Sequence, residues 1–189
     1  MSIDNKIFRF VYIASMRDAT MQRSYKGPKK WLEDDAVITL VQPILEPFVQ
    51  NVIKNAFLDQ DSFDKSFTKK AEDLCNVINQ KAGDKEFSFG NAQKLINIMT
   101  KYFYIQGYMN SSIRTGFKFC HCPMDNQLLE RVKKETGDSI FNNGWGDLNF
   151  DQVNGKNVLP NKYLRFQEEV RKLAANDGLT AIEYDYWVW

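Results

Sequence analysis

The residues most able to do chemistry lie in one short stretch, 119–126, which reads FCHCPMDN. It holds the only histidine of the chain, His121, between Cys120 and Cys122, and Asp125 follows. Three consecutive residues make a poor tetrahedral clamp for zinc, and the third cysteine would have to come from a distant element. Adjacent side chains also do not align easily as a nucleophile and its base. We therefore expect buried thiols beside a hydrogen-bonded histidine, with no metal and no cofactor.

Asp125 carries more information than the histidine. If Pro123 is the first residue of a helix, Asp125 is the third, where free backbone amides and the helix dipole stabilise a carboxylate. We expect Asp125 to be an anion at neutral pH. Acidic residues are common in first turns, so this pattern alone does not identify a catalytic group. Two lysines, Lys94 and Lys101, are seven residues apart and share one face of a helix expected at 89–108.

Helices must position these side chains, because apolar residues recur at helical spacing along most of the chain. We expect a mainly α-helical fold, one compact domain over residues 1–189, with a long ordered loop near 137–160 where asparagine, glycine and aspartate gather. Pro43 and Pro47 leave open whether 31–57 forms one helix or two. The pattern from Thr180 to Glu183 is a capping box, which favours a short helix in the tail. The expected helices cover 7–21, 31–57, 61–78, 89–108, 123–136, 161–176 and the tail.

Composition limits the function without naming it. With 189 residues the chain can bury a core without disulfides, and its net charge of +1 argues against indiscriminate binding to nucleic acid. Three cysteines without a CxxC pair, no leader pattern and no long apolar run predict a cytoplasmic protein that does not bind a membrane. The segment 17–30 is locally basic and is either a solvated loop or a phosphate contact. Its basic residues are Arg17, Arg23, Lys26, Lys29 and Lys30.

The segment 90–97, GNAQKLIN, together with PMD at 123–125 and ERV at 130–132, resembles the helix-hairpin-helix DNA glycosylases. In that family a glycine-containing hairpin leads into a helix with a catalytic lysine, and a catalytic aspartate begins a later helix. The resemblance implies a compact helical glycosylase fold, with DNA as the partner and with Lys94 and Asp125 as the catalytic pair. It also implies a hairpin that contacts DNA phosphates through Gly90 and Asn91.

The chemistry implied by the resemblance depends on a neutral lysine. Burial beside Lys101 would lower the pKa of Lys94, whose amine would then attack the sugar carbon of a flipped nucleotide and form an imine as the base departs. Asp125 would accept a proton or stabilise positive charge on the sugar. Each of these residues also has an ordinary structural role, as a solvated lysine, a core tyrosine or a loop plug. The candidates for stacking on the base are Tyr104, Tyr108 and Trp145.

Two other classes of function remain open. The chain could be a non-enzymatic helical interaction module or inhibitor, for example one encoded by a phage or mobile element, which binds a protein partner. It could also be a helical DNA-binding scaffold without catalysis, distinguished by salt-dependent duplex binding without base release. The anchor for a protein partner would be the aromatic tail, unless that tail closes the core of the domain itself. Its aromatic residues are Tyr184, Tyr186, Trp187 and Trp189.

Overall fold

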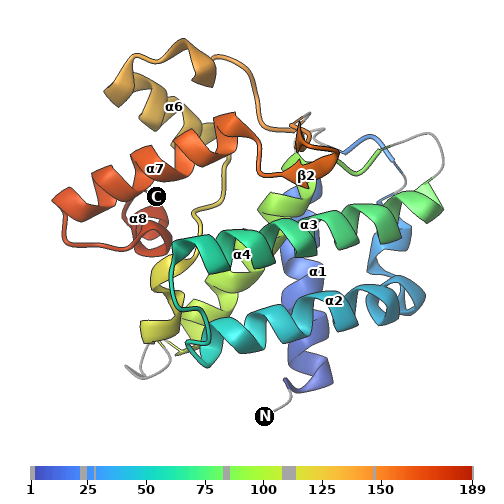
Figure 1. Ribbon diagram of the computed structural model, residues 1–189. Helices are drawn as coiled ribbons and strands as arrows, with labels where there is room; N and C mark the ends of the chain where they lie inside the picture. Colours follow the sequence, from blue (N-terminus) through green and yellow to red (C-terminus); the bar gives the residue numbers. More distant parts are fainter. Residues whose placement is uncertain are drawn as a thin grey trace.

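The computed structural model describes residues 3–21, 25–27, 29–82, 86–107, 114–146 and 148–188. Within these ranges the fold is mainly α-helical, which confirms the predicted class. Short 3₁₀ helices lie at Lys30–Glu33, Thr115–Phe119 and Ser139–Phe141. The α-helices are α1 (Asn5–Thr20), α2 (Asp35–Ile53), α3 (Gln60–Ala82), α4 (Phe89–Gly107), α6 (Asn126–Thr136), α7 (Asn161–Asn176) and α8 (Ala181–Val188), as Figure 1 shows.

Helix α4 is the centre of the fold. Helix α1 packs along it, α3 contacts it, and α2 lies beside α3 (Figure 1). Every residue of α4 from 89 to 100 is buried, polar side chains included. Because the apolar side chains around it form one cluster that extends from α1 to α8, the buried amides of Gln93 and Asn97 on α4 bond to partners inside the protein.

Helix α2 runs without a break through Pro43 and Pro47, so the segment expected as one or two helices contains a single α-helix. Its buried face packs on α3, where the ring centroid of Phe48 lies 5.5 Å from that of Phe63 and 6.2 Å from that of Phe67. Among the described residues, α2 is the one helix that is long and apolar enough to cross a membrane by length and composition alone. The sequence was expected to contain no long apolar run, and α2 is an exception to that expectation by this criterion.

Helix α6 begins later than the sequence suggested. The chain is still extended at Pro123, and Asp125 is the N-cap residue, whose carboxylate accepts a hydrogen bond from the Leu128 amide at 3.0 Å. The expectation that Pro123 opens the helix was therefore wrong, although Asp125 does stabilise the helix start. At α8 the capping box is confirmed, because the Thr180 amide donates to Glu183 Oε2 at 2.9 Å.

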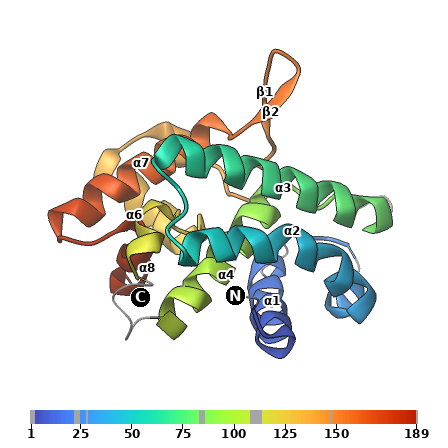
Figure 2. The same ribbon diagram turned by 60° about the horizontal axis from the view of Figure 1, so that its bottom comes forward.

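The described residues of the segment 137–160 form more than the expected loop. After the 3₁₀ turn at Ser139–Phe141 the chain forms an antiparallel hairpin of β1 (Asp151–Val153) and β2 (Lys156–Val158). The two hairpin residues at the turn, Asn154 and Gly155, both have positive φ, at 51° and 70°, which is the geometry of a tight two-residue connection. Figure 2 shows this hairpin projecting away from the helices.

Candidate functional site

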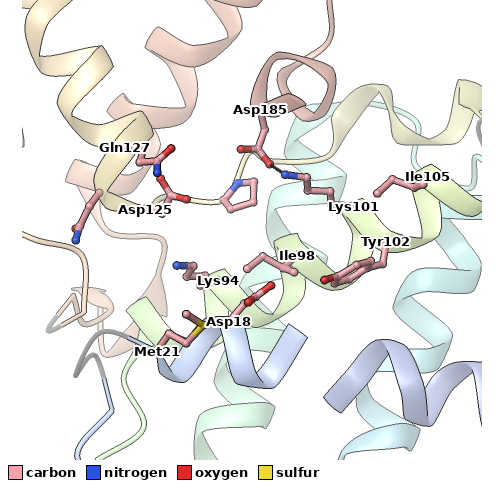
Figure 3. A pocket seen from close by; sticks show the side chains of 12 residues that line it. Asp18, Met21, Lys94, Ile98, Lys101, Tyr102, Ile105, Asp125, Gln127 and Asp185 are labelled. Atoms are coloured by element: carbon pink, nitrogen blue, oxygen red, sulfur yellow. Dashed lines mark ion pairs between the residues drawn. The ribbon is translucent and has the colours of Figure 1, made fainter. Parts of the chain in front are cut away.

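A pocket of about 230 Å³ lies between α1, α4, the start of α6, and α8 (Figure 3). It brings together Lys94 and Asp125, the pair that the sequence singled out although they are 31 residues apart. Apolar side chains from α1, α4 and Pro123 form part of its wall. Its ionisable side chains are Asp18, Lys94, Lys101, Tyr102, Asp125 and Asp185.

Lys94 is the least ordinary group in this pocket. Its side chain is only 8% exposed, and Nζ lies 4.6 Å from the centroid of the Trp145 ring. No hydrogen bond or ion pair joins its ammonium to any residue that the structure describes. Burial lowers the pKa of Lys94, and the nearby carboxylates, Asp125 foremost, raise it by less than burial lowers it. The neutral form of the Lys94 amine is therefore more favoured in the pocket than it would be in water.

Trp145, Gly146 and Leu148 lie tightly against the start of α4. A Cβ atom on Gly90 would lie 2.0 Å from the Trp145 carbonyl oxygen, so only glycine permits this approach. The Gly90 amide donates to the Leu148 carbonyl at 2.8 Å, and the Ser88 hydroxyl donates to the Gly146 carbonyl at 2.5 Å. These contacts place the Trp145 ring beside Lys94.

The role predicted for Gly90 and Asn91 is wrong. Gly90 lies in the first turn of α4 instead of in an exposed hairpin, and its amide is already bonded. Asn91 is fully buried, and its side-chain amide donates to the Ala19 carbonyl at 3.1 Å. Neither residue offers a free amide to a DNA phosphate, because both are occupied in joining α4 to its neighbours.

Two buried glutamines hold the extended segment that leads to Asp125. Gln93 of α4 accepts a hydrogen bond from the Met124 amide at 3.1 Å and donates to the Met124 carbonyl at 3.0 Å. Gln167 of α7 makes the same double contact with Cys122, at 2.9 Å and 2.7 Å. Because each side-chain amide matches a peptide group in both directions, the backbone before Asp125 is fixed across the pocket from α4.

Lys101 lies about two helical turns beyond Lys94 on α4, and its ammonium already has a partner. Its ammonium forms an ion pair with Asp185 of α8, a side chain that is 1% exposed (Figure 3). Asp18 comes from α1 and lies on the same side of the pocket as Lys94, as Figure 3 shows. The shared face predicted for the two lysines is thus present, but Lys101 lies inside the pocket wall and does not form an outer phosphate contact.

His121 belongs to the core and not to the pocket. It is fully buried, with Nδ1 3.0 Å from the Tyr163 hydroxyl and Nε2 2.9 Å from Asp64 Oδ1. The Tyr163 oxygen also accepts a hydrogen bond from Asn97 at 2.8 Å, so its proton is directed to Nδ1 and the Nε2 proton to Asp64. The buried thiols and hydrogen-bonded histidine expected from the sequence are both observed.

The other predicted contacts divide into four groups. Tyr104 and Trp145 are each 3% exposed, so neither can stack on an extruded base, and that expectation was wrong. Arg17 is exposed but binds Glu33 through two hydrogen bonds, at 2.9 Å and 2.6 Å. Lys26, Lys29 and Lys30 are exposed after the end of α1. Two predicted residues, Arg23 and Tyr108, lie outside the described ranges.

Sequence reasoning missed four residues that shape the site. Asp18 and Asp185 supply carboxylates, and Gln93 and Gln167 hold the segment before Asp125. No local pattern marks them, because the nearest signal, an isolated aspartate or glutamine on a helix, usually indicates a solvated side chain. No protein-family model, no curated protein and no solved structure matches this chain. The resemblance to DNA glycosylases therefore stays a prediction.

Proposed function

We propose that this protein is a lysine-dependent lyase of the DNA glycosylase type, in which Lys94 forms an imine with the sugar of a nucleotide and Asp125 transfers the proton. The observation that carries the proposal is the state of the Lys94 amine. It is buried, lies in a pocket opposite Asp125, has no ion-pair partner among the described residues, and has a lowered pKa. These are the conditions under which a lysine acts as a nucleophile.

The simplest substrate is the aldehyde form of an abasic sugar in DNA. The lone pair of Lys94 Nζ attacks C1′, and the carbonyl oxygen leaves as water, which gives an imine. Asp125 then removes a proton from C2′, the electrons form the C2′–C3′ double bond, and the phosphate at C3′ departs with the electrons of the C–O bond. Water hydrolyses the imine and restores the Lys94 amine. With an intact nucleotide, the base would leave from C1′ with the electrons of its bond to the sugar.

The DNA backbone would lie outside the pocket. Lys29 supports this arrangement because its ammonium donates to the carbonyl of Thr20, the residue before Met21 at the pocket wall. Lys26 and Lys30 are exposed in the same segment and would supply further phosphate contacts. Phosphate contacts of this kind give affinity without sequence preference and weaken as salt is added.

The direct test is borohydride trapping on a duplex with one abasic site. We expect a covalent adduct in the unchanged protein and none in Lys94→Met. Asp125→Asn should still form the adduct, but without borohydride it should cleave the strand at the abasic site roughly a hundredfold or more slowly, because removal of the C2′ proton follows imine formation. Lys134→Met, which removes an exposed lysine on α6, should trap like the unchanged protein. An adduct of equal yield in Lys94→Met, or mapped to another lysine, would disprove the proposal.

A partner-binding function is the second candidate, and the exposed side chain of Trp187 is the observation that favours it. Tyr184 is buried and Tyr186 donates to the Lys101 carbonyl at 3.1 Å, whereas Trp187 is 73% exposed. Trp189 lies outside the described ranges. A photo-crosslinker at position 187 should capture one discrete protein in the source cell, and the same group at Leu58, which is even more exposed at 90%, should not. Identical patterns from both positions would remove this candidate.

A further inference from the structure

The charge of the pocket is acidic, although a DNA-directed site would be expected to be basic. Three carboxylates and two lysines line it, which leaves a formal charge of −1 when Lys94 is protonated and −2 when Lys94 is neutral. Lys101 is already paired with Asp185. The carboxylates of Asp18 and Asp125 therefore face the pocket with no lysine dedicated to them, apart from the buried Lys94 amine that both influence.

The side chain of Lys94 is the second observation that supports a ligand site in this acidic cluster. It is more than nine-tenths buried, lies along the pocket in Figure 3, and has no hydrogen-bond partner among the residues that the structure describes. A buried amine normally bonds to an acceptor, so one that has none is suited to a group that enters from outside. The contact of Lys94 with the Trp145 ring leaves room on the pocket side for an acceptor or an electrophilic carbon of a ligand.

The volume of the pocket restricts the size of that ligand. An engineered protein cavity of about 150 Å³ holds benzene. A pocket of about 230 Å³ therefore holds one ring with one or two small substituents, but not a nucleotide with its phosphate. Its apolar wall of Ile98, Ile105 and Met21 suits the body of such a ring.

We propose that the pocket selects a single-ring ligand that is cationic or rich in hydrogen-bond donors, with a carbonyl-type carbon placed at Lys94 and the positive end placed at Asp18 and Asp125. This inference rests on the proposed imine chemistry and narrows its substrate. Within a nucleic acid, it means a unit whose base or base-like portion presents amino or positively charged nitrogen to the two carboxylates. An anionic group on the same ring is repelled by both.

The test uses three aldehydes of one shape that differ only in charge: benzaldehyde, 4-formylbenzoate and 4-formyl-N,N,N-trimethylanilinium. Each forms a C–N bond to Lys94 Nζ with loss of water, and borohydride then delivers hydride to the imine carbon, which leaves a stable secondary amine. Mass spectrometry of the intact protein and its peptides measures the rate of trapping at Lys94. We expect the cation to react at least roughly tenfold faster than the benzoate, with benzaldehyde between them.

The variants Asp18→Asn and Asp18→Glu identify the cause of that order. The first should reduce the preference for the cation severalfold and the second should keep it, while Lys134→Met, far out on α6, should leave all three rates unchanged. Equal rates for the three aldehydes, or a faster benzoate, would overturn the inference and leave the imine proposal standing. Absence of trapping at Lys94 with every aldehyde would instead overturn the proposed function itself.

Discussion

At Lys94 a long cationic side chain is almost wholly enclosed, and enclosure disfavours its charged form. The folded protein keeps it there beside Trp145 because Gly90 allows the loop to approach α4. Residues at functional sites often lower the stability of a fold in this way. Lys94 is therefore expected to reduce stability in return for a reactive amine.

The variant Lys94→Met should raise the free energy of unfolding by roughly 1 kcal/mol at neutral pH. The folded state releases the Lys94 proton below the ordinary value of 10.5, so the unfolded chain binds more protons between the folded pKa and 10.5. Raising the pH through that interval therefore stabilises the unchanged protein, and the advantage of Lys94→Met disappears. Urea unfolding from pH 7 to 10 measures this. A variant that is less stable throughout would show that the charge is well accommodated.

At the scale of elements, the position of Asp125 is set by helices to which it does not belong. Among the described residues the segment 122–124 pairs with no strand, and the side chains of Gln93 on α4 and Gln167 on α7 bond to its backbone instead. Asp125 then caps α6, so the segment is held by α4 and α7 and also connects to α6. A change in either glutamine should therefore act both on stability and on the pocket.

Replacing Gln167 with methionine should cost roughly 2–3 kcal/mol, because the buried Cys122 amide loses its acceptor and the Cys122 carbonyl keeps only the longer bond from Asn97, at 3.4 Å. Gln167→Glu keeps an acceptor for the Cys122 amide. If the new carboxyl is protonated, this variant should lose less stability than Gln167→Met. Displacing Asp125 also removes a carboxylate that raises the pKa of Lys94, so the pH of half-maximal Lys94 labelling by an amine reagent should fall. Glu168→Met, an exposed neighbour on α7, is the control. An unchanged pH dependence of Lys94 labelling in Gln167→Met would show that Gln167 does not position Asp125 in the pocket.

The sequence foresaw most elements and only part of the site. The helix at 161–176 and the capping box at Thr180 follow from local rules that the structure obeys. The hairpin at 151–158 was missed because its Asn154–Gly155 turn lies within a run of polar residues that also suits a loop. Asp185 could not be placed beside Lys101 from sequence, since nothing local records which helices meet.

Across the whole molecule, a chain of buried polar groups links α3, α4 and α7 around His121. Burial lowers the pKa of His121 more than its Asp64 neighbour raises it, so the folded protein holds a neutral imidazole. Burial raises the pKa of Asp64, but hydrogen bonds, chiefly from His121, lower it by more. Both groups are satisfied only while the helices remain packed, which makes the network a property of the complete fold.

Acid should therefore destabilise the protein in two steps. Below 6.5, the ordinary value for histidine, the unfolded chain takes up a proton that the folded His121 refuses, so the free energy of unfolding falls with pH until the folded pKa is reached. A second loss begins below 3.8, where the unfolded Asp64 is protonated and the folded one is not. Urea midpoints at pH 7.5, 6.5 and 5.5 report the first step. A urea midpoint that stays constant from pH 7.5 to 5.5 would contradict the expected effect of His121.

The walls of the pocket come from positions as far apart as Asp18 and Asp185. Contacts at such separation form late, since a long stretch of chain must be ordered before they can be made. A growing or partly folded chain would carry Lys94 in water, with an ordinary protonated amine. Reactivity would then appear only when the folded protein encloses Lys94, so that no incomplete copy of the protein would react with aldehydes around it.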